Sequence, residues 1–172
     1  MLKKIISGGQ PGVEIAALDA AVKLDIPHEG WAYKRVREGG GAYQELYNLK
    51  NIDVPSYHVR LEKNIIDSDG TVILTHGQLI IGIKIIRDLA NKHKKPCLNV
   101  NLTNCSIGHA VAAIRKWISN NEIEAIYFTG SRSVGDPDIY DETIRIIEDI
   151  CRVEREQQTL LGFKENDDST PS

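Results

Sequence analysis

The chain has 172 residues, a length typical of one globular domain, and a formal net charge of −3. Hydrophobic residues make up 41% of the sequence and charged residues 26%, which indicates a packed core and excludes a largely disordered chain. The near-neutral charge argues against a broad basic face for nucleic acid, and no apolar run in the sequence is long enough to cross a bilayer.

The cysteines bear on the cellular compartment. Cys97, Cys105 and Cys151 are odd in number and show no Cys-x-x-Cys spacing, a pattern typical of reduced intracellular thiols. We therefore expect a cytoplasmic protein with no membrane partner and no nucleic-acid partner.

Short apolar runs alternate along the chain with segments of helical periodicity. Strands are expected at residues 2–6, 28–32, 71–74, 97–100 and 125–128, and helices at residues 13–24, 57–66, 82–93, 107–120 and 138–157. The residues between Tyr33 and Pro55 are predicted to be irregular, and a connection of that length is more often functional or mobile.

This alternation predicts an α/β fold, with a mostly parallel sheet of about five strands flanked by helices on both faces. Residues 1–158 are predicted to form a single ligand-binding domain. The polar residues 159–172 are predicted to be a disordered tail.

Ligands of an open parallel sheet bind beyond the carboxyl ends of the strands, and the predicted strands are followed there by polar or glycine-containing segments. These segments are Ser7-Gly8-Gly9-Gln10-Pro11-Gly12, Thr75-His76-Gly77-Gln78, Asn99 with Asn101, and Thr129-Gly130-Ser131-Arg132-Ser133. Their convergence at one edge predicts a binding site.

The first of these segments, residues 7–12 (the glycine turn), has the features of an anion site. Glycines allow positive φ and a close approach of the backbone, and the helix that follows directs N–H groups and its positive dipole end into the same space. Phosphate or carboxylate is the expected guest. The alternative is a plain strand-to-helix turn.

Two charged positions extend the candidate site. Arg132 can hold phosphate or carboxylate with two parallel hydrogen bonds, the alternative being a surface loop arginine. Asp67 and Asp69 lie where a helix dipole disfavours negative charge. Asp69-Gly70 is a standard turn pair, and the role of Asp67 stays open. His76 ends a strand and is placed to contact a ligand, while the five histidines show no metal-ligand spacing.

Motifs spread over nearly the whole chain resemble those of the putative molybdenum carrier family. The resemblance rests on Ile5-Ile6-Ser7-Gly8-Gly9-Gln10-Pro11-Gly12-Val13-Glu14, Gly30-Trp31, Lys34, Tyr47-x-Leu49, Arg60, Asn64-x-x-Asp67-Ser68-Asp69-Gly70-Thr71, Lys95-Pro96-Cys97, Gly130-x-Arg132-Ser133 and Pro137-x-Ile139-Tyr140. That family is related to the lysine-decarboxylase-like phosphoribohydrolases.

The resemblance implies a Rossmann-like three-layer fold, a homo-oligomer (dimer or tetramer) and a phosphate-bearing ligand. The ligand it implies is molybdenum cofactor, a pterin phosphate, or else a nucleotide. The candidate ligand-binding residues are Ser7, Gly8, Gly9, Gln10, Gly12, Lys34, Asp67, His76, Gly77, Gly82, Gly130, Ser131, Arg132 and Ser133. No catalytic residue and no metal ligand is assigned.

The sequence departs from the family pattern at two places. Pro11 and Glu14 stand where threonine and aspartate are usual. Because proline has no N–H, Pro11 removes one backbone donor from the helix start. After the strand at residues 71–74, the family usually carries a Gly-Gly-Thr turn at the start of the next helix. Only Gly82 of that turn is present here, and Ile81 and Ile83 beside it resist positive φ.

Three functions follow as hypotheses. The favoured one is a binding or carrier protein for the phosphate-bearing ligand. The second is a nucleotide-processing enzyme, such as a nucleoside 5'-monophosphate phosphoribohydrolase, in which Arg132 pairs with Glu14 or Asp67. The third is a ligand-free oligomeric interaction domain, whose isoleucines at positions 80, 81 and 83 pack against a partner subunit.

Overall fold

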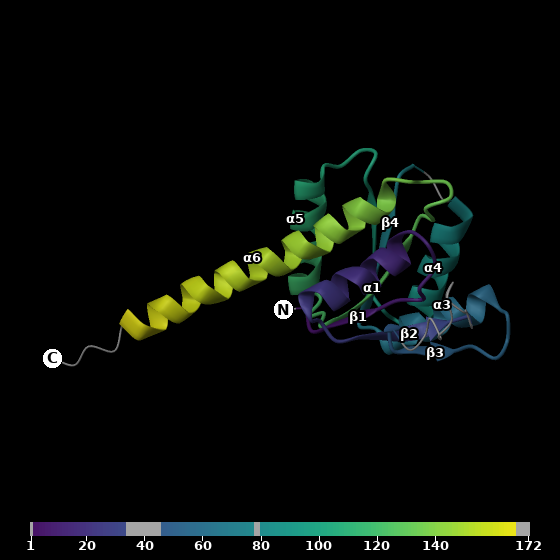
Figure 1. Cartoon of the computed structure of the whole chain (residues 1–172), viewed down its shortest axis with the longest axis horizontal. Coiled ribbons are helices and arrows are strands. Elements are labelled where there is room, and N and C mark those ends of the chain that lie inside the picture. The colour runs from purple at the N-terminus through teal and green to yellow at the C-terminus, as the bar shows by residue number, and fades with distance from the viewer. Residues whose placement is uncertain (1, 34–45, 78–79, 168–172) are drawn as a thin grey trace.

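The computed structural model describes residues 2–33, 46–77 and 80–167 (Figure 1). The elements follow one another as β1 (Lys4–Ile6), α1 (Val13–Leu24), β2 (His28–Ala32), β3 (Leu49–Asn51), α3 (Tyr57–Asp67), β4 (Gly70–Thr75), α4 (Ile80–Lys92), β5 (Cys97–Asn101), α5 (Ile107–Asn120), β6 (Ala125–Gly130) and α6 (Ile139–Asp167). No helix of the described residues is long and apolar enough to cross a membrane.

All strand pairs are parallel, and the sheet order is β3-β2-β1-β6-β4-β5. The predicted Rossmann-like three-layer fold is confirmed, with one strand more than expected. The additional strand is β3, which pairs with β2 through the register Gly30↔Leu49. This strand lies in the segment that the sequence predicts to be irregular. Its three residues include one buried side chain, so the sequence shows neither an apolar run nor an alternating pattern there.

Alternate side chains of the central strands enter two different cores. Val72, Leu74 and Phe128 face the core formed with α1, α5 and α6. Ile73 and Tyr127, at the intervening positions, face the core formed with α3 and α4. The period of two along each strand therefore divides the helices between the two faces of the sheet.

Helix α6 is longer than the sequence predicts. The buried side chains that the structure describes in this helix lie between Ile139 and Cys151, and the helix continues to Asp167 and projects away from the sheet (Figure 1). The predicted helix ended near Gln157. The glutamate, glutamine, leucine and lysine residues that follow favour helix by their intrinsic propensity. Residues 168–172 of the predicted tail lie outside the described residues.

We predict that a chain ending at Gln157 keeps the stability of the full chain. The described part of the core ends at Cys151, before the truncation point, and the truncation retains the 2.7 Å hydrogen bond from Arg115 to the Gln157 side chain. The free energy of unfolding, measured by urea denaturation, should change by no more than about 0.5 kcal/mol.

The matched control is Ile147→Ala, which empties a fully buried position of the same helix and should cost about 2–5 kcal/mol. A truncated chain destabilised as strongly as this control would show that the distal part of α6 contributes to the fold.

Candidate functional site

The strand order places a crevice at the carboxyl ends of β1, β6 and β4. Helix α1 connects β1 to β2 across one face of the sheet, whereas α4 connects β4 to β5 across the other face. These two connections diverge from the centre of the sheet, where β6 lies between β1 and β4. Such a switch point is where open α/β sheets bind their ligands.

A buried ion pair between Glu14 and Arg60 lies in this crevice. The Nη1 of Arg60 is 2.7 Å from the Oε2 of Glu14, and the two side chains are only 2% and 4% exposed. The same Oε2 accepts a hydrogen bond from the Gln10 N–H at 3.0 Å. The other oxygen, Oε1, accepts from the Tyr127 hydroxyl at 2.7 Å and the Thr129 hydroxyl at 2.9 Å. Four donors therefore surround one carboxylate.

The environment of Arg60 keeps its guanidinium charged. Burial by itself opposes the charged form, but the charge of Glu14 outweighs it and raises the pKa of Arg60 above its ordinary value. The Tyr33 and Tyr57 rings lie 5.6 and 5.8 Å from its Cζ atom, within range of cation–π attraction. The buried Nε of Arg60 has no hydrogen-bond partner among the described residues. One donor of this buried cation is therefore unsatisfied within the described residues.

The glycine turn fits tightly around this ion pair. A Cβ on Gly8 would lie 1.7 Å from Arg60 Nη1 and 2.8 Å from Glu14 Oε2, so only glycine leaves room for the guanidinium. At Gly12, with φ +111°, a Cβ would lie 2.3 Å from the carbonyl oxygen of Ser131. The two glycines thus let α3 and the loop after β6 approach the turn.

Several donors of the turn are satisfied within the chain. Gln10 N–H donates to Glu14, and Val13 N–H donates to the Ser131 carbonyl at 3.2 Å. The Ser7 hydroxyl donates to the Glu14 carbonyl at 2.7 Å, and Pro11 has no N–H. The turn is therefore a less open anion cradle than its sequence predicts.

A small cavity of about 30 Å³ opens beside the ion pair (the Arg60 cavity). Its lining residues are Gln10, Pro11, Glu14, Tyr57, Arg60, Thr129, Gly130, Ser131 and Arg132. This volume holds one or two water molecules, so a phosphate group has room only at the mouth. Arg132 is exposed there, and its side chain has no hydrogen bond or ion pair with the residues the structure describes.

The structure brings four of the predicted site residues together around the Arg60 cavity, namely Gln10, Gly130, Ser131 and Arg132. Ser133 lies next to them, and its N–H donates to the Pro11 carbonyl at 3.4 Å. Lys34 lies outside the described residues.

Asp67, Gly77 and Gly82 have other surroundings. Asp67 accepts a 2.8 Å hydrogen bond from the Trp31 indole at the C-terminal end of α3, about 15 Å along the helix from Tyr57. Gly77 donates its N–H to Asn101 and Thr103. Gly82 lies in the first turn of α4, where an added Cβ would be 4.0 Å from the Tyr57 hydroxyl.

His76 is held between two carboxylates. Its Nδ1 lies 2.8 Å from Asp136 Oδ1, and its backbone N–H donates to Asp136 Oδ2 at 3.3 Å. Its Nε2 lies 2.9 Å from Glu142 Oε2 as an ion pair without hydrogen-bond alignment. Partial burial opposes protonation, but the two carboxylates outweigh it and raise the pKa of His76. His76 therefore joins the β4–α4 loop to the β6–α6 segment.

Sequence reasoning did not select Arg60, Tyr57, Tyr127 or Thr129 as site residues. A signal for Arg60 is present in the sequence, because Arg60 and Asn64 lie one position before Leu61 and Ile65 of the apolar stripe of α3. Both polar side chains are buried. A charged residue on the buried edge of a helix needs a partner, and that need points to a buried anion elsewhere in the chain.

Comparisons with known proteins agree with this architecture. The sequence profile of the circularly permutated YpsA SLOG family matches residues 5–151. The chain is similar to the crystal structure of a putative molybdenum carrier protein from Syntrophus aciditrophicus SB, with 40% sequence identity and a TM-score of 0.78. That alignment covers 87% of this chain and 94% of the other. No curated protein matches the sequence.

We predict that Arg60→Met destabilises the protein by about 3–5 kcal/mol, because it leaves the buried Glu14 carboxylate without a cation. The double variant Glu14→Gln/Arg60→Met removes both charges and should recover part of the loss. Denaturant unfolding of the wild type, both single variants and the double variant measures this coupling.

Lys84→Met is the matched control, because it breaks an exposed pair with Asp88 and should cost no more than about 1 kcal/mol. If the Arg60 and Glu14 losses were independent and simply added, the ion pair would not be the organising contact of the site.

A second prediction concerns pH. The pKa of His76 is raised above 6.5 in the folded protein. The contacts of His76 with Asp136 and Glu142 therefore stabilise the folded state fully below pH 6.5, and this stabilisation is lost as the pH rises through the higher folded pKa. The difference in unfolding free energy between wild type and His76→Gln should therefore shrink as the pH rises from below 6.5. A difference that stays constant or grows over that range would show that protonated His76 does not stabilise the fold through these two carboxylates.

Proposed function

Since this chain belongs to the circularly permutated YpsA SLOG family, we propose that it binds and carries a small phosphate-bearing molecule at the mouth of the Arg60 cavity. The observation that carries the proposal is the exposed guanidinium of Arg132, which has no ionic partner among the described residues. A planar guanidinium holds phosphate oxygens with two parallel hydrogen bonds.

The charges around the cavity favour an anion. Arg60 and Arg132 contribute two positive charges, and Glu14 contributes one negative charge that is already paired with Arg60. One positive charge remains at the mouth. The polar Gln10 lines the same cavity and offers a further hydrogen bond.

The hydrogen bonds of Glu14 support binding without turnover. An ionised carboxylate has about four lone-pair sites, and four donors already occupy those of Glu14. A carboxylate in this state has no free position from which to take a proton from a substrate. The site is therefore better suited to hold an anion than to perform acid–base chemistry.

The name of the similar protein from Syntrophus aciditrophicus supports molybdenum cofactor, a pterin phosphate, as the ligand. A nucleotide presents the same two parts, a phosphate and a planar ring. Tyr57 lines the cavity and is 37% exposed, so its ring offers a face on which a planar ring can stack. We also propose that Lys34, Gly82 and the glycine turn contact this ligand, as the sequence predicts.

A nucleotide-processing enzyme is the alternative, and it is favoured by the position of Glu14 in the same cavity wall as Arg132. A carboxylate there can stabilise cationic character on a sugar. Incubation with a panel of nucleoside monophosphates, scored for release of free base, decides between the two. Release of base would replace the carrier proposal, and its absence would remove the enzyme.

Self-association as a dimer or tetramer is part of the proposal. Ile81 in the first turn of α4 is 77% exposed, and Val134 in the loop after β6 is 95% exposed. Apolar side chains this exposed are suited to contact a second subunit. A single monomeric species in sedimentation velocity would remove this role, and an oligomer that binds none of the ligands would favour an interaction domain.

We predict that Arg132→Gln weakens the binding of molybdopterin or nucleoside monophosphates by about tenfold or more, because it removes a charge-assisted pair of hydrogen bonds. Isothermal titration calorimetry on the full chain measures the loss. Arg145→Gln is the matched control, because Arg145 is also exposed but lies on α6 outside the cavity lining. Equal binding by wild type and Arg132→Gln would overturn the assignment of the site.

A further inference from the structure

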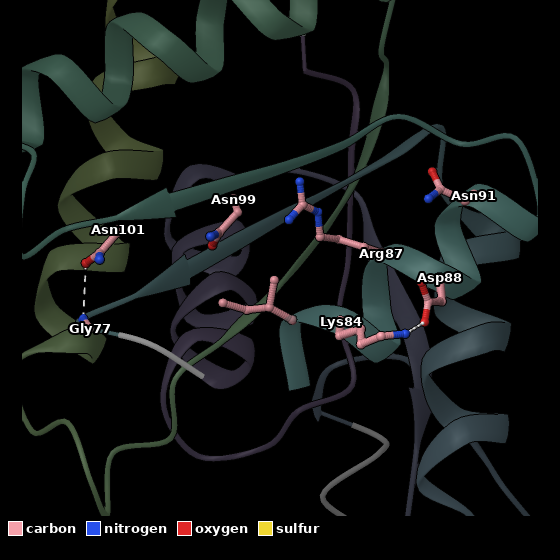
Figure 2. Close-up of a pocket in the computed structure, with 8 residues that line it drawn as sticks. Gly77, Lys84, Arg87, Asp88, Asn91, Asn99 and Asn101 are labelled. Atoms are coloured by element: carbon pink, nitrogen blue, oxygen red, sulfur yellow. Dashed lines mark hydrogen bonds and ion pairs between the residues drawn. The ribbon is translucent and has the colours of Figure 1, made fainter. Parts of the chain in front are cut away.

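A second and larger cleft lies between α4 and the edge strand β5 (Figure 2). Its volume is about 630 Å³, and it shares no lining residue with the Arg60 cavity. We call it the Arg87 cleft, and its lining residues are Gly77, Ile83, Lys84, Arg87, Asp88, Asn91, Asn99 and Asn101. Sites for small molecules commonly have volumes of about 300–1,000 Å³.

The polar character of the Arg87 cleft follows from the pleat of β5. Cys97, Asn99 and Asn101 are alternate residues and so share one face of the strand. Cys97 packs against the core formed with α3 and α4, but the next two positions on that face are amides. A parallel strand beside a covering helix is normally apolar on this face, so the two amides give the cleft a hydrogen-bonding wall.

Some polar groups of the cleft are already paired. Lys84 Nζ lies 2.6 Å from Asp88 Oδ2, one turn further along α4. Asn101 Oδ1 accepts hydrogen bonds from the N–H groups of Gly77 and Thr103. The Asn101 contacts hold one end of the cleft, and the Lys84–Asp88 pair neutralises two of its three charges.

Three other side chains of the cleft remain available. Arg87, Asn91 and Asn99 form no side-chain hydrogen bond or ion pair with any residue the structure describes. Figure 2 shows Arg87 reaching from α4 toward β5, the strand that carries Asn99. Among the described residues that line the cleft, the one acidic residue is Asp88, which is paired with Lys84. The cleft is therefore lined by one unpaired positive charge and by two amides, those of Asn91 and Asn99, that have no partner among the described residues.

We propose that the Arg87 cleft is a second binding site, which takes a small molecule bearing one oxyanion group, a carboxylate or a phosphate. Arg87 binds two oxygens of the group with its parallel N–H donors, and the Asn99 amide donates a further hydrogen bond. Asn91, one turn beyond Arg87 on α4, contacts other polar atoms of the ligand.

The place of the cleft in the sheet supports a ligand that exchanges with solvent. Strand β5 has a neighbour on one side only, so the cleft opens at the edge of the sheet. The ligand is held mainly by the attraction between its oxyanion group and Arg87 in a loosely enclosed cleft. Such an attraction gives weak binding that depends on salt concentration.

The test is titration of the ¹⁵N-labelled full chain with acetate, inorganic phosphate and adenosine 5'-monophosphate, followed by NMR. We expect chemical-shift changes at the Asn91 and Asn99 side-chain amides and at the Arg87 Nε–H. Arg87→Gln should weaken binding about tenfold or more, and Arg87→Lys, which keeps the charge without the paired donors, should weaken it less. The probe that binds most tightly distinguishes carboxylate from phosphate.

Arg132→Gln and Arg145→Gln are the controls, and both should leave the shifts in the cleft unchanged. Unchanged cleft shifts in Arg132→Gln separate this site from the proposed carrier site, so either proposal can fail alone. The proposal is overturned if none of the probes shifts the cleft residues. It is equally overturned if the shifts persist at full affinity in a folded Arg87→Gln variant, or if they disappear in Arg132→Gln.

Discussion

The buried pair of Glu14 and Arg60 is the interaction on which the rest of the site depends. It joins the start of α1, the middle of α3, the glycine turn and two residues of β6. Removing two charges from water is costly, and the cost is offset here because the carboxylate receives four hydrogen bonds. The requirement for glycine at position 8 follows directly, since the guanidinium passes where a side chain would be.

The same pair limits the hydrogen-bond donors that the glycine turn can offer to the proposed ligand. Because the Glu14 carboxylate takes the Gln10 N–H, and the start of α1 is bound to the loop after β6, the glycine turn has fewer free donors than its sequence indicates. The positive charge available to a guest is on Arg132, at the mouth of the Arg60 cavity. In the proposed binding site, the contact with the ligand therefore comes more from a side chain than from the backbone of the glycine turn.

The sequence predicts most of the fold because β4 and β6 are apolar runs and the helices carry regular apolar stripes. It does not reveal β3, whose pairing with β2 depends on backbone contacts between residues far apart in the chain. It selects Arg132 but not Arg60, because the partner of Arg60 lies 46 residues away. Asp67 could have been set apart from the turn by topology, since a helix that returns to the next strand ends at the opposite edge of the sheet.

The most direct test of whether Arg132 holds the anion is a crystal structure of the protein soaked with tungstate, an oxyanion that is located by its anomalous scattering. We expect a peak within hydrogen-bond distance of the Arg132 guanidinium, at the mouth of the Arg60 cavity, with the Glu14–Arg60 contact intact. The contradictory result is a peak bound to Arg60 in place of the Glu14 carboxylate, or no peak beside Arg132.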